Sequence, residues 1–179
     1  AWFGLLLVFE IETYWQHIYA IRRVRWPLNL MRLACFGVLA HTLVVYTGEF
    51  LNVLEPTKLA LAEAFCGQDN VTLYELHNQV YTTLAPQACT DRLATGELTF
   101  LLNATTVMSD QGWRIALNQA LVSLIECASW LAAGAAFATS AFLKRRQTYT
   151  GRLAALVRHT PHVSYCLIVG CALSWGWYG

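Results

Sequence analysis

Four apolar stretches, each long enough for a helix to approach the width of a membrane, constrain this chain more than any other feature. They cover residues 1–21, 30–51, 115–143 and 163–178. A bilayer core about 30 Å thick needs about 20 apolar residues at 1.5 Å of rise per residue. Charged residues make up 13% of the chain, against roughly 25% in a soluble domain. The sequence therefore predicts an all-α integral membrane protein with four transmembrane helices in a lipid bilayer.

Basic residues gather in the two short connections between these stretches. Arg22, Arg23 and Arg25 lie between the first two stretches. The connection between the last two carries Lys144, Arg145, Arg146, Arg152 and Arg158. Because Lys and Arg accumulate in cytoplasmic loops, both connections are expected on the inner side. The net charge of the whole chain is +1, with no basic patch, so no nucleic-acid partner is expected.

The long segment over residues 49–113 has the opposite charge. It holds eight acidic residues and two basic ones, and it is expected on the outer side together with both termini. The chain then divides into two membrane parts, residues 1–48 and 114–179, and an outer cap over 49–113. The start at Ala1, directly on apolar residues, is expected after removal of a signal peptide or for a piece of a longer protein.

The outer cap is too long for an unstructured loop, and its pattern predicts a mostly helical fold. Residues 58–65 are good helix formers. Over residues 73–84, leucine and valine recur every three or four positions, as on one face of a helix. Residues 98–102 are interpreted either as a short strand or as a segment on the membrane surface.

Cysteines predict one disulfide in the cap. Cys66 and Cys89 are the two cysteines of this segment, and a bridge between them would add roughly 3 kcal/mol in an oxidising compartment. The alternative is two unpaired buried thiols. The remaining cysteines lie in the apolar stretches and are interpreted as small packing residues: Cys35, Cys127, Cys166 and Cys171.

Two glycosylation sequons also lie in the cap. They are Asn70-Val-Thr72 and Asn103-Ala-Thr105. Both agree with an outer location of the cap, and both would stay bare in a bacterial or organellar protein. Asn70 and Asn103 are therefore candidate glycan sites.

Three ionisable side chains interrupt the apolar stretches. Glu10, His41 and Glu126 each lie roughly 13 to 17 Å below the outer boundary by residue count, so we expect them to meet near the midplane. An ionisable group in hydrocarbon needs a partner or a function. One hypothesis is a proton or cation relay through these three groups. The alternative is that they form hydrogen bonds between helices, within this chain or to a neighbouring subunit.

A cofactor is a further alternative for the same region. Glu and His are suitable metal ligands, with Cys127 or Cys171 as possible additions, and haem ligation would draw on His17, His41 or His162. No E-x-x-H or H-x-x-x-H pair stands at ligand spacing in these stretches. The sequence therefore leaves the cofactor unknown.

A stripe of small residues in the third stretch predicts a helix-packing face. Its members recur every four residues: Ala128, Ala132, Ala136 and Ser140. Small residues in this register let membrane helices approach closely. The sequence also lacks a Walker loop, G-x-G-x-x-G, G-x-S-x-G and H-E-x-x-H, so an enzyme is not the favoured class.

These features lead to three hypotheses for function. The first is a non-catalytic, multi-pass membrane subunit that packs with other membrane proteins or with copies of itself. The second is a small oligomeric proton or cation channel or transporter that uses Glu10, His41 and Glu126. The third is a membrane redox subunit that binds haem or a metal.

Overall fold

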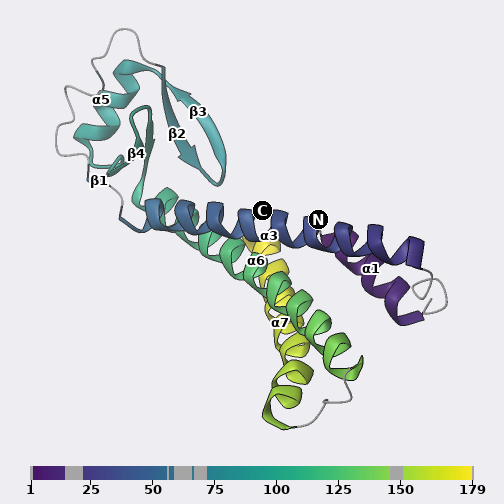
Figure 1. Cartoon of the computed structure of the whole chain (residues 1–179). Helices are drawn as coiled ribbons and strands as arrows, with labels where there is room; N and C mark the ends of the chain where they lie inside the picture. The colour runs from purple at the N-terminus through teal and green to yellow at the C-terminus, as the bar shows by residue number, and fades with distance from the viewer. Residues whose placement is uncertain are drawn as a thin grey trace. The chain divides into compact units, whose positions relative to one another are not determined.

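The computed structural model describes residues 2–14, 22–55, 57–58, 66, 72–145 and 151–178. These residues are mostly helical (Figure 1), in α1 (Trp2–Tyr14), α3 (Arg22–Leu54), α5 (Pro86–Ala94), α6 (Asp110–Arg145) and α7 (Gly151–Tyr178). Five short strands complete the description: β1 (Thr57–Lys58), β2 (Leu73–His77), β3 (Val80–Leu84), β4 (Phe100–Asn103) and β5 (Thr106–Met108).

The chain forms two compact units, which we describe separately. The helical unit comprises Ala1–Val45 and Leu124–Leu173. The cap unit comprises Tyr46–Ser123 and Ser174–Gly179. The long helices α3 and α6 each contribute residues to both units.

In the helical unit, α1 packs antiparallel against the first half of α3. Val8 and Leu28 are buried together, with Ile11 and Val24 packed against them. Gly4 lies one turn before Val8 in α1 and approaches Cys35 of α3. A β-carbon at Gly4 would lie only 2.8 Å from the Sγ of Cys35. The absence of a side chain at position 4 thus allows the two helices to touch.

Helix α6 packs on α3 and α1 through small residues and aromatic rings. The Cys127 thiol donates a hydrogen bond of 3.5 Å to the carbonyl of Leu39. A β-carbon at Gly134 would lie 3.1 Å from the ring of Phe36. Phe9 and Phe137 stack at 5.4 Å between ring centroids. These contacts fix the core of the helical unit.

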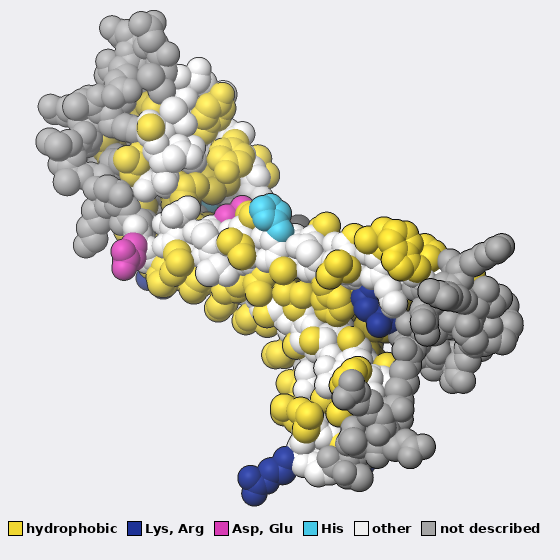
Figure 2. All heavy atoms as spheres, viewed as in Figure 1, with side chains coloured by type: hydrophobic (Ala, Val, Ile, Leu, Met, Phe, Trp, Pro, Cys, Tyr) yellow, Lys and Arg dark blue, Asp and Glu magenta, His cyan; other side chains and the backbone are white. Residues whose placement is uncertain are grey.

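Two of the described helices are long and apolar enough to cross a membrane. They are Trp26–Leu54 within α3 and Asp110–Leu143 within α6. In the most apolar 18-residue segment of each helix, the protein itself buries only 11% and 28%, respectively. A core helix of a soluble protein would instead be mostly buried. Large apolar side chains such as Leu33 and Val44 are about 70% exposed, and hydrophobic side chains cover much of the visible surface (Figure 2). Membrane association fits this surface.

The first and fourth expected spans are not both long and apolar enough, over their described residues, to count as candidate membrane spans. The described part of helix α1 has 13 residues, fewer than the roughly 20 that a bilayer core requires, and residues 15–21 of the first expected span lie outside the described residues. Helix α7 has 28 residues, but Arg152, Arg158 and two histidines in its first half lower its apolarity. The described residues therefore contain two candidate membrane-spanning helices, in α3 and α6, and do not establish the four that the sequence predicts.

The cap contains a β-sheet, which corrects the prediction of a mostly helical cap. Its strand order is β1-β4-β5-β2-β3, with β2 parallel to β5 and the other neighbours antiparallel. The predicted helix over 73–84 is the β2–β3 hairpin, paired from Leu73 with Leu84 to His77 with Val80. Valine, threonine and tyrosine favour strands, and this preference prevails over the helical spacing of the leucines.

The other cap predictions have mixed outcomes. Residues 98–102 overlap strand β4, so the strand interpretation is confirmed and the membrane-surface one is not needed. Lys58 lies in β1 instead of starting a helix, and residues 59–65 lie outside the described residues. Helix α5 begins at Pro86, which suits the first helical position because its missing N–H has no partner to lose there.

A disulfide and an ion-pair network hold the cap together. Cys66 and Cys89 form the predicted disulfide, with Cα atoms 5.7 Å apart, inside a cluster that contains Leu73. Arg92 of α5 donates hydrogen bonds of 2.7 Å to Glu75 and 2.9 Å to Glu97. These hydrogen bonds, first to Glu75 and then to Glu97, raise the pKa of Arg92 above its ordinary value. The cap is thus cross-linked by covalent and charged contacts.

Candidate functional site

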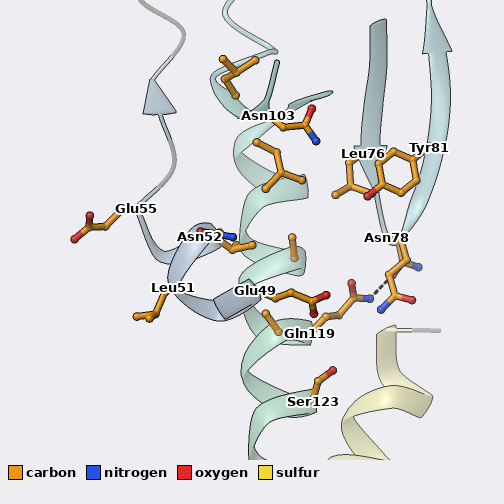
Figure 3. Close-up of a pocket in the computed structure, with 16 residues that line it drawn as sticks. Glu49, Leu51, Asn52, Glu55, Leu76, Asn78, Tyr81, Asn103, Gln119 and Ser123 are labelled. Atoms are coloured by element: carbon orange, nitrogen blue, oxygen red, sulfur yellow. Dashed lines mark hydrogen bonds between the residues drawn. The ribbon is translucent and has the colours of Figure 1, made fainter. Parts of the chain in front are cut away.

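The described residues line a polar hollow of about 790 Å³. It lies within the cap unit, between the end of α3, the tip of the β2–β3 hairpin, β4 and the first turns of α6 (Figure 3). Its volume falls in the range of about 300 to 1,000 Å³ that is typical of small-molecule sites. We therefore build the candidate site from this hollow.

The α3 wall of the hollow is anchored by a tryptophan of α6. The Trp113 indole N–H donates a hydrogen bond of 2.8 Å to the carbonyl of Val53. Val53 belongs to the last turn of α3, where backbone carbonyls have no partner within the helix. Phe100 of β4 packs on the same tryptophan with ring centroids 5.0 Å apart. Trp113 thus joins the end of α3, β4 and α6 around the hollow.

The hairpin tip is the second wall, and its conformation is unusual. Asn78 and Gln79 both have positive φ angles, 47° and 62°, as a two-residue turn between right-twisted strands requires. Asparagine tolerates this conformation better than most residues. The Asn78 Oδ1 accepts a hydrogen bond of 2.8 Å from the Nε2 of Gln119 on α6. This bond ties the hairpin tip to the helix.

Strand β2 and helix α6 approach each other closely beside the hollow. A β-carbon at Gly112 would lie 2.9 Å from the carbonyl oxygen of Leu76, so a larger residue at this position would push the strand away. Gln119 follows two turns later on the same helix and is 7% exposed. Gly112 and Gln119 together set the distance and the hydrogen bonding between the hairpin and α6.

The lining of the hollow is rich in carboxylates and amides. Figure 3 shows Glu49 and Gln119 directed toward one another with Asn78 beside them, while Glu55 points away from this group. None of the described lining residues is a Lys, Arg or His. Such a lining repels anions and accepts hydrogen bonds from positively charged groups.

The three ionisable residues predicted to meet near the midplane do not all come together. Val8 packs beside Leu28, so Glu10 lies beside the early part of α3, and His41 is thirteen residues beyond Leu28, about 20 Å along the helix. The expected common depth of Glu10 and His41 is therefore wrong, because residue counting ignored where α1 pairs with α3. Both side chains are exposed.

Glu126 is placed differently. Its neighbour Cys127 contacts the carbonyl of Leu39, which puts Glu126 near the level of His41 on α3. Its carboxylate also acts electrostatically on the Cys127 and Cys171 thiols, which are both buried. The structure thus gathers Glu126 and two cysteines, and the relay through all three predicted groups stays a prediction.

The cofactor candidates are scattered. His41 and His162 are exposed on α3 and α7, and His17 lies outside the described residues. Within the described parts of the chain, no group of three or more His, Cys, Asp or Glu side chains is arranged to hold a metal ion. Haem or metal binding stays a prediction from the sequence.

Of the two sequons, one can be located. Asn103 is exposed at the end of β4, and its Oδ1 accepts hydrogen bonds from the Thr105 backbone N–H at 2.9 Å and from the Thr105 hydroxyl at 3.1 Å. Asn70 lies outside the described residues. Glycosylation at either position stays a prediction.

The small-residue stripe of α6 is partly covered. Ala136 is buried and Ser140 is half-buried, whereas Ala128 and Ala132 are exposed. These two alanines line a largely apolar groove of about 520 Å³ between α6 and α7. Ser129 lies in the same groove, is 3% exposed, and its hydroxyl has no hydrogen-bond partner. The stripe therefore leaves room for a further group on this side of α6.

No family model, curated protein or solved structure matches this chain. The functional argument therefore depends on the residues and their geometry.

Sequence reasoning missed the group formed by Asn78, Gln119 and Glu49. Asn78 lies within residues 73–84, which the sequence predicts as a helix, and no predicted feature connects it with Gln119. A turn signal was present, because Asn78-Gln79 precedes a run that is rich in β-branched and aromatic residues, VYTTL. Reading that dipeptide as a hairpin turn would have placed Asn78 at a strand end, but not next to Gln119.

Proposed function

We propose that this chain is a multi-pass membrane subunit, without catalytic activity of its own, that packs with other membrane helices in a larger assembly. The four apolar stretches would cross the bilayer, with the basic connections inside and the cap and both termini outside. The partners would be other membrane proteins or further copies of this chain.

A small and polar face of α3, exposed along its length, is the observation that carries this proposal. Ala34, Gly37, His41 and Gly48 share this face and are all exposed. Nothing lies within 4 Å of a β-carbon built at Gly37 or at Gly48. Lipid cannot satisfy an imidazole, whereas glycines allow another helix to approach closely. A neighbouring membrane helix would satisfy both requirements.

The groove between α6 and α7 supports the same proposal. Ala128 and Ala132 line it beside the buried hydroxyl of Ser129. Exposed alanines on one wall of a groove allow a partner helix to approach closely.

Introducing a bulky side chain on the α3 face tests the proposal. The full chain is purified in mild detergent, and its mass in the detergent micelle and its co-purifying chains are measured. Gly37→Leu has space in the isolated chain, so it is expected to remove the partner without unfolding the protein. Val38→Leu is the matched control, since Val38 is already a large exposed side chain, and it is expected to keep the partner. A wild-type chain that runs alone, or partners that survive Gly37→Leu, would contradict the proposal.

A second candidate is proton or cation movement by an oligomer of this chain. The contact between Cys127 and Leu39 favours it, because it brings Glu126 near the level of His41. Glu126→Gln removes the exchangeable charge with little change in shape. Flux into reconstituted vesicles is expected to fall to the background of empty vesicles in this variant, and unchanged flux excludes the candidate.

A further inference from the structure

We propose that the first half of α7 binds the headgroups of anionic phospholipids through one side of the helix, which carries Arg152, His159 and His162. We call this side the basic face. The inference rests on the membrane location proposed above, in which α7 begins on the inner side of the bilayer. It does not depend on a partner protein.

The basic face lies on one side of a regular helix. Its three side chains are spaced by seven and then three residues, which brings them to the same side at 3.6 residues per turn. All three are exposed. Within the described part of the chain, no ion pair or hydrogen bond occupies any of them. Ala154, Val157 and Ser164, on the opposite side of α7, are buried, so the basic face points away from the helical unit.

Charge selects an anionic partner for this face. Residues 144–162 contain five Lys or Arg, two His and no Asp or Glu. Helix α7 carries no acidic residue along its whole length, so its own sequence supplies nothing that neutralises Arg152. Guanidinium and imidazole N–H groups donate strong hydrogen bonds to phosphate oxygens. A phosphate group is therefore the chemistry that this face fits.

An apolar strip beside the basic face favours a lipid over a soluble anion. The strip consists of Leu153, Leu156 and Val163, which are 53%, 64% and 59% exposed. A free phosphate or a nucleic acid would leave these side chains in water. A phospholipid covers both surfaces, because its headgroup meets the basic face and its acyl chains meet the strip. Helices that lie at a membrane interface combine two such faces.

The length of α7 brings the basic face to the level of the headgroups. The helix is continuous over 28 residues (Figure 1), which span about 42 Å, whereas the hydrocarbon core is about 30 Å thick. The apolar end of α7, residues 163–178, follows directly after His162. With that end in the core, the basic face lies at the inner edge of the core and in the adjoining headgroup layer, where anionic lipids attract basic side chains.

Native mass spectrometry of the purified full chain in mild detergent tests the inference. It measures the retention of phosphatidylglycerol, which is anionic, against phosphatidylcholine with the same acyl chains. The wild-type chain is expected to bind phosphatidylglycerol at least about fivefold more tightly, which is the effect of one basic residue near an anionic surface. Arg152→Gln is expected to weaken phosphatidylglycerol about fivefold and to leave phosphatidylcholine unchanged. Leu156→Ser is expected to weaken both lipids alike.

Arg114→Gln is the matched control. It removes the same charge from an exposed arginine in the first turns of α6, on the expected outer side, and should leave the preference for phosphatidylglycerol unchanged. Equal retention of the two lipids, or equal effects of Arg152→Gln and Arg114→Gln, would overturn the inference. Displacement of phosphatidylglycerol by an equal concentration of inorganic phosphate would also overturn it, because the face would then be a site for free anions.

Alkaline extraction of membranes separates a failure of this inference from a failure of the proposed membrane location. A chain that is released from the membrane pellet would overturn both. A chain that stays in the pellet but retains the two lipids equally would overturn the lipid inference alone. A chain that prefers phosphatidylglycerol but purifies without partners would support the inference and contradict only the proposed assembly.

Discussion

The helical unit and the cap unit differ in how they are held together. In the cap, a disulfide joins Cys66 to Cys89, Arg92 bridges two carboxylates, and Trp113 and Gln119 hydrogen-bond across elements. The helical unit contains packed apolar side chains and the thiol contact of Cys127. The cap is held by covalent, charged and hydrogen-bonded contacts, whereas the helical unit exposes apolar surface that water would not favour.

The exposed side chains of the two units sharpen this contrast. Val38 on α3 is 55% exposed and Val80 on β3 is 59% exposed. The two positions look alike by exposure alone. The proposed membrane location implies that Val38 faces lipid and Val80 faces water, so the same substitution should have different effects at the two sites.

The largest expected effect comes from a charge at Val38, near the middle of the expected span over 30–51. Val38→Arg is expected to cost about 3 to 4 kcal/mol in membrane insertion, the difference between valine and arginine at a helix centre. Val80→Arg in the cap is expected to change stability by about 0.5 kcal/mol or less. The fraction of protein in the membrane pellet after alkaline extraction measures the first, and thermal unfolding of the purified protein measures the second. Equal tolerance of both substitutions would remove the contrast.

Breaking the disulfide is the next largest effect, and it is confined to the cap. Cys89→Ser is expected to lower the free energy of unfolding of the cap by about 3 kcal/mol, because the open chain gains conformational entropy when it unfolds. Limited proteolysis followed by mass spectrometry should show faster cleavage within the cap. Cys166→Ser, at an exposed free cysteine of α7, is the control and should leave the cleavage pattern unchanged.

The smallest of the three effects tests the link between α3 and α6 in the cap. Trp113→Phe keeps an aromatic ring next to Phe100 but removes the hydrogen bond to Val53. It is expected to destabilise the cap by about 1 kcal/mol and to raise the exchange rate of amide protons at the end of α3. Trp177→Phe changes a tryptophan that is 85% exposed and should do neither. Identical exchange in both variants would show that the indole N–H contributes nothing here.

The stabilising contribution of Arg92 to the cap is expected to be insensitive to alkaline pH. The pKa of Arg92 is raised by its hydrogen bonds to Glu75 and Glu97. A raised folded-state pKa contributes stability that is present below the unfolded pKa and is lost only as the pH rises through the folded value. For arginine both values lie above the pH range in which proteins are studied, so alkaline pH does not remove this contribution.

Local sequence patterns predicted the helices well and the cap poorly. The apolar runs over 30–51 and 115–143 fall inside α3 and α6, because an uninterrupted apolar run of this length has few other solutions. The run over 73–84 was ambiguous, because Leu73, Leu76, Val80 and Leu84 match a helical period while their neighbours favour strands. Pairing with β5 and closure of a turn at Asn78 decided between the two.

In the candidate site, too, some features could be predicted from the sequence and others could not. The charge of the cap and the disulfide partners could be read from residue counts alone. The hydrogen bond between Asn78 and Gln119 spans 41 positions, and no periodicity connects residues so far apart. Glu10 and His41 failed to coincide because their relative depth depends on which residues of α1 and α3 touch.

Composition and residue order are enough to predict which segments are apolar, where the charges gather, and which two cysteines pair. These are properties of composition and order, since apolar area and net charge are carried by each segment wherever it lies. Only the tertiary structure decided that the cap is a sheet, that Glu126 lies apart from Glu10, and that Glu49 faces two amides in a hollow. Those outcomes depend on contacts between distant residues, whose free energy exists only once the chain has folded.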